Sequence, residues 1–189
     1  MNARQLFQGA RVRLDALDPE KDAATLSAWS HDLDFARRMS AEPYPFTASA
    51  ARKRIEAWAE ESDKHESISL ALRHSDGARL LGTLRIEHIV WPHRTAQLKL
   101  GIGSPVDRGQ GLGKEMLDLI LRYCFDELNM QRLSASIPSH NPEALRFFTR
   151  IGFVEEARLR GAFGWNGARW DDVWLGLLQS EWAPAEAGR

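Results

Sequence analysis

The sequence predicts an α/β fold in which a mixed sheet is flanked by helices. Stretches where apolar and polar residues alternate, the pattern of a strand, lie between stretches with a period of about 3.6 residues, the pattern of a helix. The chain has 189 residues, 43% apolar and 27% charged, which is typical of a globular protein with a sizeable core. We expect one domain over residues 1–182 and a frayed tail over 183–189.

Seven stretches are predicted to be strands from their alternation and from the turn residues around them. They are residues 11–14, 68–72, 80–90, 96–103, 133–137, 153–160 and 169–178. Asp76-Gly77 is a strong signal for a tight turn between the second and third strands. The last two strands are expected to form a hairpin joined by the loop 161–167.

The predicted helices begin after residues whose side chains can accept the first free N–H groups. These capping residues are Asp18 before Pro19, Thr47, and Asn141 before Pro142. Gly152 has the position of a glycine that ends a helix. The helix that starts near residue 112 carries an apolar stripe that includes Cys124, so we expect this cysteine to lie in the core and not to act as a nucleophile. Residues 31–46 are predicted to be irregular.

Residues 96–115 carry the strongest functional signal. A strand over 96–103 is followed by a glycine-rich turn, Arg108-Gly-Gln-Gly-Leu-Gly-Lys114, and then by the long helix. Glycines let an anion approach the backbone, and the first N–H groups of a helix attract negative charge. The order strand, glycine-rich turn, helix therefore predicts a phosphate-binding site.

The motif excludes two common phosphate sites. The dinucleotide pattern G-x-G-x-x-G would need glycine at Val106 or Lys114, and the P-loop would need glycine at Arg108 and serine or threonine at Glu115. The pattern Arg/Gln-x-x-Gly-x-Gly/Ala fits, and it resembles the pyrophosphate loop of the GNAT acetyltransferases. Three residues carry this match: Arg108, Gly111 and Gly113.

The second half of the chain extends the resemblance. Asn141-x-x-Ala144-x-x-x-Phe148-x-x-x-Gly152-Phe153 follows the GNAT order, and residues 171–182 are similar to the subgroup that acetylates N-termini of ribosomal proteins (RimJ/RimL-like). The resemblance implies a GNAT fold with about seven mostly antiparallel strands. Its strands at 96–103 and 133–137 would be parallel neighbours that splay apart, so that the pantothenyl arm of acetyl-CoA pairs with the first one.

The resemblance implies a direct transfer of acetyl from acetyl-CoA to a neutral amine within a ternary complex. The residues expected to bind the cofactor are Leu100, Gly101, Ile102, Gly103, Arg108, Gly109, Gln110, Gly111, Leu112, Gly113, Lys114, Asn141 and Phe148. A backbone N–H near Gly101 is expected to stabilise the oxyanion. Arg108 and Lys114 are expected to pair with phosphates, although both also suit solvated helix-end charges. Asn141 also suits a plain helix cap.

Two positions depart from the family pattern. Phe148 stands where many members have a tyrosine that protonates the departing thiolate, and Gln97 stands where relatives often have glutamate. Either the thiolate leaves unassisted or Ser139 or His140 supplies the proton. Glu87 and His140 are the candidate general bases, since a carboxylate or an imidazole can take the proton of the amine. Each would alternatively be an exposed residue without a catalytic part.

The family analogy places the acceptor site among residues 29–62, 91–94 and 161–168. The favoured acceptor is a protein or peptide N-terminus; the alternatives are a small amine such as a polyamine or aminoglycoside, or a non-catalytic acyl-CoA-binding protein. The sequence has no dense acidic cluster for a polycation, and the nearest acids in it are Asp32, Asp34 and Glu42.

Charge and composition limit the binding partners and the location that we expect for this protein. A net charge of −1 gives no general attraction to nucleic acid or to an anionic membrane. There is no hydrophobic segment of the length of a spanning helix, and the N-terminus does not resemble a signal peptide, so we expect a cytoplasmic protein. The six histidines show no ligand spacing, so no metal is expected. A homodimer is expected by family analogy.

Overall fold

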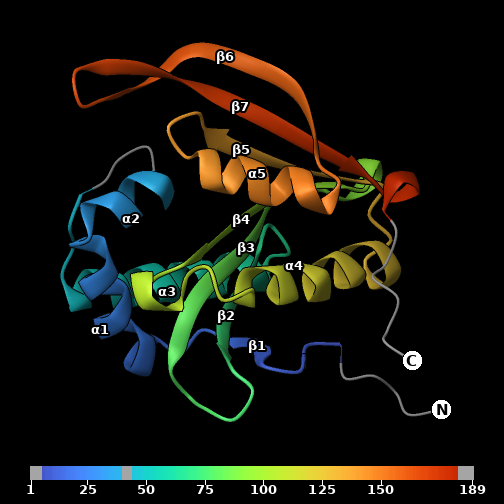
Figure 1. Cartoon of the computed structure of the whole chain (residues 1–189). Helices are drawn as coiled ribbons and strands as arrows, with labels where there is room; N and C mark the ends of the chain where they lie inside the picture. Colours follow the sequence, from blue (N-terminus) through green and yellow to red (C-terminus); the bar gives the residue numbers. More distant parts are fainter. Residues whose placement is uncertain (1–5, 40–43, 183–189) are drawn as a thin grey trace.

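A computed structural model describes residues 6–39 and 44–182, and the expected tail at 183–189 lies outside them. Seven strands form one sheet in the order β1-β2-β3-β4-β5-β7-β6 (Figure 1). The strands are β1 Val12–Ala16, β2 Ile68–His74, β3 Leu80–Val90, β4 Thr95–Ile102, β5 Arg132–Pro138, β6 Val154–Trp165 and β7 Ala168–Leu178. The α-helices are α1 Pro19–Ser30, α2 Leu33–Met39, α3 Ala48–Asp63, α4 Leu112–Arg122 and α5 Pro142–Ile151.

The pairing of β4 with β5 sets this sheet apart from a simple antiparallel one. All other neighbours are antiparallel, whereas β4 and β5 run parallel. They pair at three positions, Thr95–Gln97 with Arg132–Ser134, and then diverge. The expected splay between the two central parallel strands is therefore confirmed.

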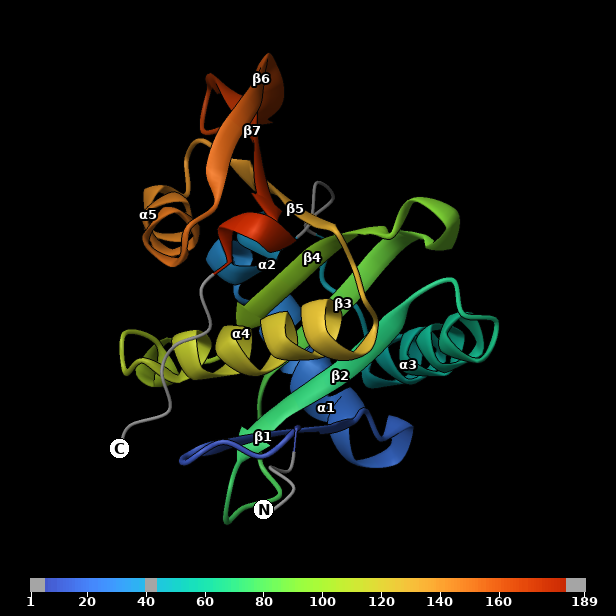
Figure 2. The ribbon, with the colours of Figure 1, turned by 90° about the vertical axis from the view of Figure 1, so that its right-hand side faces the viewer.

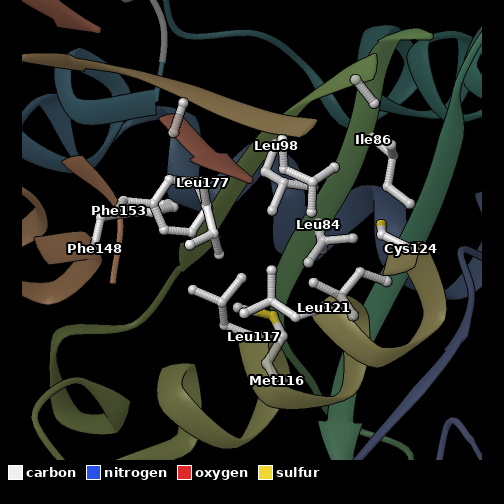
Figure 3. Close-up of a cluster of buried hydrophobic side chains, with 14 of the residues drawn as sticks. Leu84, Ile86, Leu98, Met116, Leu117, Leu121, Cys124, Phe148, Phe153 and Leu177 are labelled. Carbon is white, nitrogen blue, oxygen red and sulfur yellow. The ribbon is translucent and has the colours of Figure 1, made fainter. Parts of the chain in front are cut away.

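Helices cover both faces of the sheet. Figure 2 shows α4 on one face of the sheet and α1 and α3 on the other. Figure 3 shows the larger core, in which Leu84 and Ile86 of β3 meet Met116 and Leu121 of α4. A smaller core lies under α1 and α3 and contains Leu26 and Ile55 among its buried residues. One set of helices therefore packs on each face of the sheet.

Local signals placed the helix ends well. Asp18 accepts N–H bonds from Glu20 and Lys21, Thr47 accepts one from Ala50, and Asn141 accepts one from Ala144, so all three predicted caps are confirmed. Gly152 ends α5 with φ at 115°, a left-handed conformation that favours glycine.

Three segments differ from expectation. Residues 33–39, predicted irregular, form α2, whose first turn is held by Asp32 accepting the N–H groups of Asp34 and Phe35. Most of the predicted loop 161–167 is strand, because the hairpin turns only at Asn166-Gly167, both with positive φ, as a two-residue hairpin turn requires. The long helix changes to a π-helical turn at Tyr123–Glu127.

A buried ion pair joins α1 to β2. Asp22 is 2% exposed and Arg73 is 5% exposed, and their side chains form two hydrogen bonds of 2.7 and 3.0 Å. Arg73 also donates to the carbonyl of Ala78, and Asp22 accepts the N–H of Asp18. The hydrogen bonds that Arg73 donates to Asp22 hold the pKa of Arg73 above its usual value.

We expect Asp22→Asn to lower the free energy of unfolding by about 3–5 kcal/mol, because the guanidinium of Arg73 would lose its buried counter-charge and keep only the more exposed Asp15, at 3.7 Å. Urea unfolding followed by circular dichroism measures this. Asp63→Asn, at the exposed end of α3, is the matched control and should change stability by less than about 0.5 kcal/mol. Equal effects of the two substitutions would contradict a structural role for the pair.

The single cysteine lies in the core, as expected. Cys124 is 0% exposed, and burial raises the pKa of its thiol to about 12. We expect the native protein to resist thiol-specific alkylation at pH 8 and the urea-unfolded protein to react with one equivalent, because only the thiolate is nucleophilic. Rapid stoichiometric labelling of the native protein would contradict this placement.

Candidate active site

The backbone of β4 divides its polar groups between β3 and the gap. Gly103 donates its N–H to the carbonyl of Leu81 on β3 over 3.0 Å. Backbone N–H and C=O groups alternate in direction along a regular strand, so the N–H of Gly101 also points toward β3. The N–H groups of Leu100 and Ile102 point the other way, toward the gap. The expectation that a backbone N–H near Gly101 stabilises the oxyanion stays a prediction, and the amides next to Gly101 that point toward the gap are those of Leu100 and Ile102.

The glycines at 101 and 103 leave room for α1 and α2, which pack on one face of the sheet. A Cβ at Gly101 would lie 2.3 Å from Sδ of Met39, and one at Gly103 would lie 1.9 Å from the ring of Trp29. Since Trp29 belongs to α1 and Met39 to α2, these glycines let both helices approach β4 closely. A backbone contact of either glycine with the cofactor stays a prediction.

The glycine-rich turn ends in an open helix N-terminus. Gly109 and Gly111 have φ values of 73° and 80°, which favour glycine, and Gly111 occupies the capping position of α4. No side chain caps α4, in contrast to α1, α3 and α5. The first N–H groups of α4 are therefore left for an anion, where the helix dipole is favourable.

An N-terminal segment braces this turn. Arg11 donates to the carbonyl of Gln110 over 2.8 Å, and its guanidinium pairs with Glu115 at 3.1 Å. Burial alone would raise the pKa of Glu115, but the hydrogen bonds from the backbone and side chain of Arg11 and from the N–H of Val12 outweigh it and hold the pKa below its usual value. Glu115 thus stays ionised and fixes the start of α4 to the segment that leads into β1.

Arg108 points back to β4 and away from the turn. Its guanidinium donates to the carbonyls of Ile102 (3.1 Å) and Gly103 (2.6 Å) and lies over the ring of Phe35. It also approaches Asp32 at 3.7 Å. These contacts occupy the guanidinium within the protein, so its contact with a phosphate stays a prediction.

A groove of about 430 Å³ lies between α4 and α5, next to the glycine-rich turn. Its lining carries three cations, Lys114, Arg146 and Arg150, and the ring of Phe147. Lys114 also pairs with Asp118 at 2.7 Å. A Cβ at Gly113 would lie 3.7 Å from Phe147, an ordinary contact distance, so only a side chain larger than a methyl group would fill the space between the two helices. Lys114 was expected here, whereas Phe147 and the two arginines were missed.

The sequence held a signal for the missed arginines. Arg146 and Arg150 are four residues apart, so they lie on the same face of α5. Only the tertiary structure shows that this face meets the start of α4. Two other residues that were expected to contact the cofactor are buried in the larger core: Leu112 is 2% exposed and Phe148 is 3% exposed. The roles of both toward the cofactor stay predictions.

The corner between β5 and α5 holds Ser139, His140 and Asn141. Ser139 accepts the N–H of Asp171 on its hydroxyl oxygen at 2.9 Å, which leaves its own proton to donate. Both ring nitrogens of His140 are buried without a hydrogen-bond partner among the described residues, and the ring packs against Trp165 and Trp170. Burial, together with the charges of Arg38 and Arg37, lowers the pKa of His140, so its imidazole is neutral at pH 7.

A second cavity, of about 130 Å³, lies on the face of the sheet covered by α1, α2 and α3. β3 contributes Thr83, Arg85 and Glu87 to its lining, and β4 contributes Lys99. Glu87 pairs with Arg85 at 2.7 Å. The register partner of Glu87 is Gln97, where the pairing of β4 with β5 ends. Glu87 therefore faces the cavity, one strand away from the point where the gap begins.

The two hollows have different chemistry. The groove at α4 and α5 joins an open helix N-terminus to basic side chains, which suits a phosphorylated ligand. The cavity at β3 and β4 combines aromatic and aliphatic walls with three cations and one carboxylate, and the carboxylate could accept a proton from an amine. Within residues 6–39 and 44–182, no group of three or more metal-ligating side chains comes together. In the same part of the chain no helix is long and apolar enough to cross a membrane.

Known proteins with similar sequences and folds carry the same architecture. The family model of the acetyltransferase (GNAT) domain matches residues 11–154. The SPbeta prophage-derived uncharacterized N-acetyltransferase YokL of Bacillus subtilis is 27% identical over 175 residues, which are 93% of this chain and 94% of the relative.

Two solved structures from Vibrio cholerae share the fold. A spermidine N-acetyltransferase in complex with CoA and spermine has a TM-score of 0.78 at 22% identity, covering 92% of this chain and 98% of the other. A protein assigned as a ribosomal-protein-serine acetyltransferase has a TM-score of 0.74 at 20% identity, covering 91% and 96%. Since the family model spans well over half of the chain, this protein belongs to the GNAT acetyltransferases and is an N-acetyltransferase that uses acetyl-CoA.

Proposed function

We propose that this enzyme acetylates the N-terminal amine of a peptide or protein by direct attack on acetyl-CoA. The observation that carries the reaction geometry is the position of Glu87, which faces the cavity at the residue pair where the gap between β4 and β5 begins. A donor bound along the gap and an amine in the cavity would therefore meet beside a carboxylate.

The donor side of this proposal rests on the gap and the open start of α4. The amides facing the gap, at Leu100 and Ile102, would pair with the extended arm of acetyl-CoA as an added strand does. The free N–H groups of α4 would receive the pyrophosphate, and the basic groove with Lys114 and Arg146 would receive further phosphate charge.

The chemical steps need one base and one proton source. Glu87 accepts a proton from the amine, whose lone pair attacks the thioester carbonyl; the oxyanion is stabilised by an amide that faces the gap. Collapse breaks the carbon–sulfur bond, and the departing thiolate accepts a hydrogen bond from the hydroxyl of Ser139. The thiolate then takes its proton from solvent, to which Glu87 returns the proton of the amine. His140 is the second candidate base, because its imidazole is neutral and its nitrogens are unpartnered. Its lowered pKa disfavours it as the proton source.

The acceptor class is supported by the C-terminal residues 171–182 and by the fold shared with the ribosomal-protein-serine acetyltransferase. A small polyamine is the second candidate, since a relative of the same fold acetylates spermidine. Release of free CoA thiol, measured over N-terminal peptides, polyamines and aminoglycosides, separates the two. Turnover confined to polyamines would overturn the proposed acceptor class.

We expect Gly113→Leu to weaken CoA binding at least about tenfold, because the side chain would fill the space between α4 and α5. The backbone at this position does not require glycine, so the helix should not be destabilised. Isothermal titration with CoA measures the effect, and thermal unfolding shows that the variant is folded. A folded variant with unchanged affinity would place CoA elsewhere.

We expect Glu87→Gln to lower kcat by about 10²–10⁴ with little change in the KM for acetyl-CoA, since only proton transfer is lost.

The pH dependence of kcat/KM shows which of the two candidates, Glu87 or His140, is the general base. If His140 were the base, activity would fall as pH drops through a pKa below 6.5, and His140→Gln would abolish that acid limb. An unchanged profile and rate in both variants would remove both residues from the mechanism.

A further inference from the structure

The cavity of about 130 Å³ at β3 and β4, called the acceptor cavity below, is lined by more cations than carboxylates among the described residues. Four charged side chains line it: Arg54, Arg85, Glu87 and Lys99. Arg85 is neutralised from two sides, by Glu87 and by Glu61, with which it forms a close ion pair. The remaining two cations, Arg54 and Lys99, are therefore the charges that an acceptor would meet.

Neither of these cations has a carboxylate partner among the described residues. Arg54, on α3, lies over the ring of Phe46, with 4.4 Å between its guanidinium carbon and the ring centroid. Lys99, on β4, makes no ion pair or side-chain hydrogen bond within the described residues, and both side chains are solvent-exposed. Two cations thus line one cavity, and their charge is left for a ligand to satisfy.

The sheet register places one of them near the proposed base. Glu87 is opposite Gln97, and Lys99 is two residues further along β4 on the same face. Such diagonal neighbours are about 7–8 Å apart, with their Cβ atoms somewhat closer. An amine held beside Glu87 would therefore have Lys99 within the reach of a group a few bonds away.

We propose that the acceptor carries a carboxylate a few bonds from the reacting amine, and that Lys99 and Arg54 bind this carboxylate. This rests on the proposed function, because it identifies the same cavity as the acceptor site. The N-terminus of a peptide with an acidic first or second residue has this chemistry, and so does a free amino acid. Polyamines and aminoglycosides would instead bring additional ammonium groups against two cations, which is unfavourable.

The test measures CoA thiol release with matched pentapeptides that differ only at the second residue, as Ser-Glu-, Ser-Gln- and Ser-Lys-peptides. Free glutamate and spermidine complete the panel. We expect kcat/KM for the glutamate peptide to exceed that for the glutamine peptide by about tenfold, the value of one charge-assisted hydrogen bond. A higher kcat/KM for free glutamate than for the glutamate peptide would assign the carboxylate to an amino acid.

Substitutions of Lys99 and Arg54 test whether these two cations cause the preference for the glutamate peptide. Lys99→Met and Arg54→Met should each reduce the ratio between the glutamate and glutamine peptides toward one, and Lys99→Glu should favour the lysine peptide. Lys53→Met is the matched control, because Lys53 is an exposed cation next to Arg54 on α3 that does not line the cavity. It should leave the ratio unchanged.

The failures are distinguishable. Equal turnover of the three peptides, or a preference that survives all cavity variants, overturns this inference while the proposed function stands. A preference for spermidine overturns it together with the proposed acceptor class. Absence of turnover on every acceptor, with CoA bound, overturns both this inference and the proposed function.

Discussion

The short parallel contact between β4 and β5 is the constraint on which the site depends. Three paired positions hold the two halves of the sheet together, and beyond Gln97 the strands separate. A parallel pair that ends this early leaves backbone groups of β4 without a neighbouring strand, and an extended ligand can satisfy them. The glycine-rich turn follows directly from the free end of β4, so the gap and the anion site lie along one path.

Packing on the opposite face holds β4 in place. Gly101 and Gly103 have no side chain because Met39 and Trp29 occupy that space, and Arg108 returns from the turn to the last carbonyls of the strand. The same helices that press on β4 also form the wall of the acceptor cavity. The support of the strand and the shape of the cavity therefore depend on the same contacts, so the proposed acceptor specificity would be coupled to the stability of this face.

Electrostatics distinguish the two sides of the gap. On the donor side, an uncapped helix N-terminus and a basic groove attract phosphate. On the acceptor side, Glu87 lies among cations, one of which it neutralises. A single carboxylate in such surroundings suits proton transfer better than the binding of a polycation, which would need several acids. In the proposed mechanism, proton transfer and acceptor choice thus depend on different residues of one cavity.

Features that depend only on neighbouring residues of the chain could be predicted from the amino-acid sequence. Caps at Asp18, Thr47 and Asn141, the end of α5 at Gly152 and the open turn before α4 are local hydrogen-bonding or φ preferences, so they can be read from a few residues. The seven strands and the splayed central pair also followed, the second through a family resemblance. Three features became visible only in the folded molecule. The strand register shows which amides of β4 face the gap, and the packing of α1 and α2 explains the glycines at 101 and 103. The fold also brings Arg54 and Lys99 to the same cavity as Glu87. These facts depend on strand register and on helices packed from distant parts of the chain, and no local pattern encodes them.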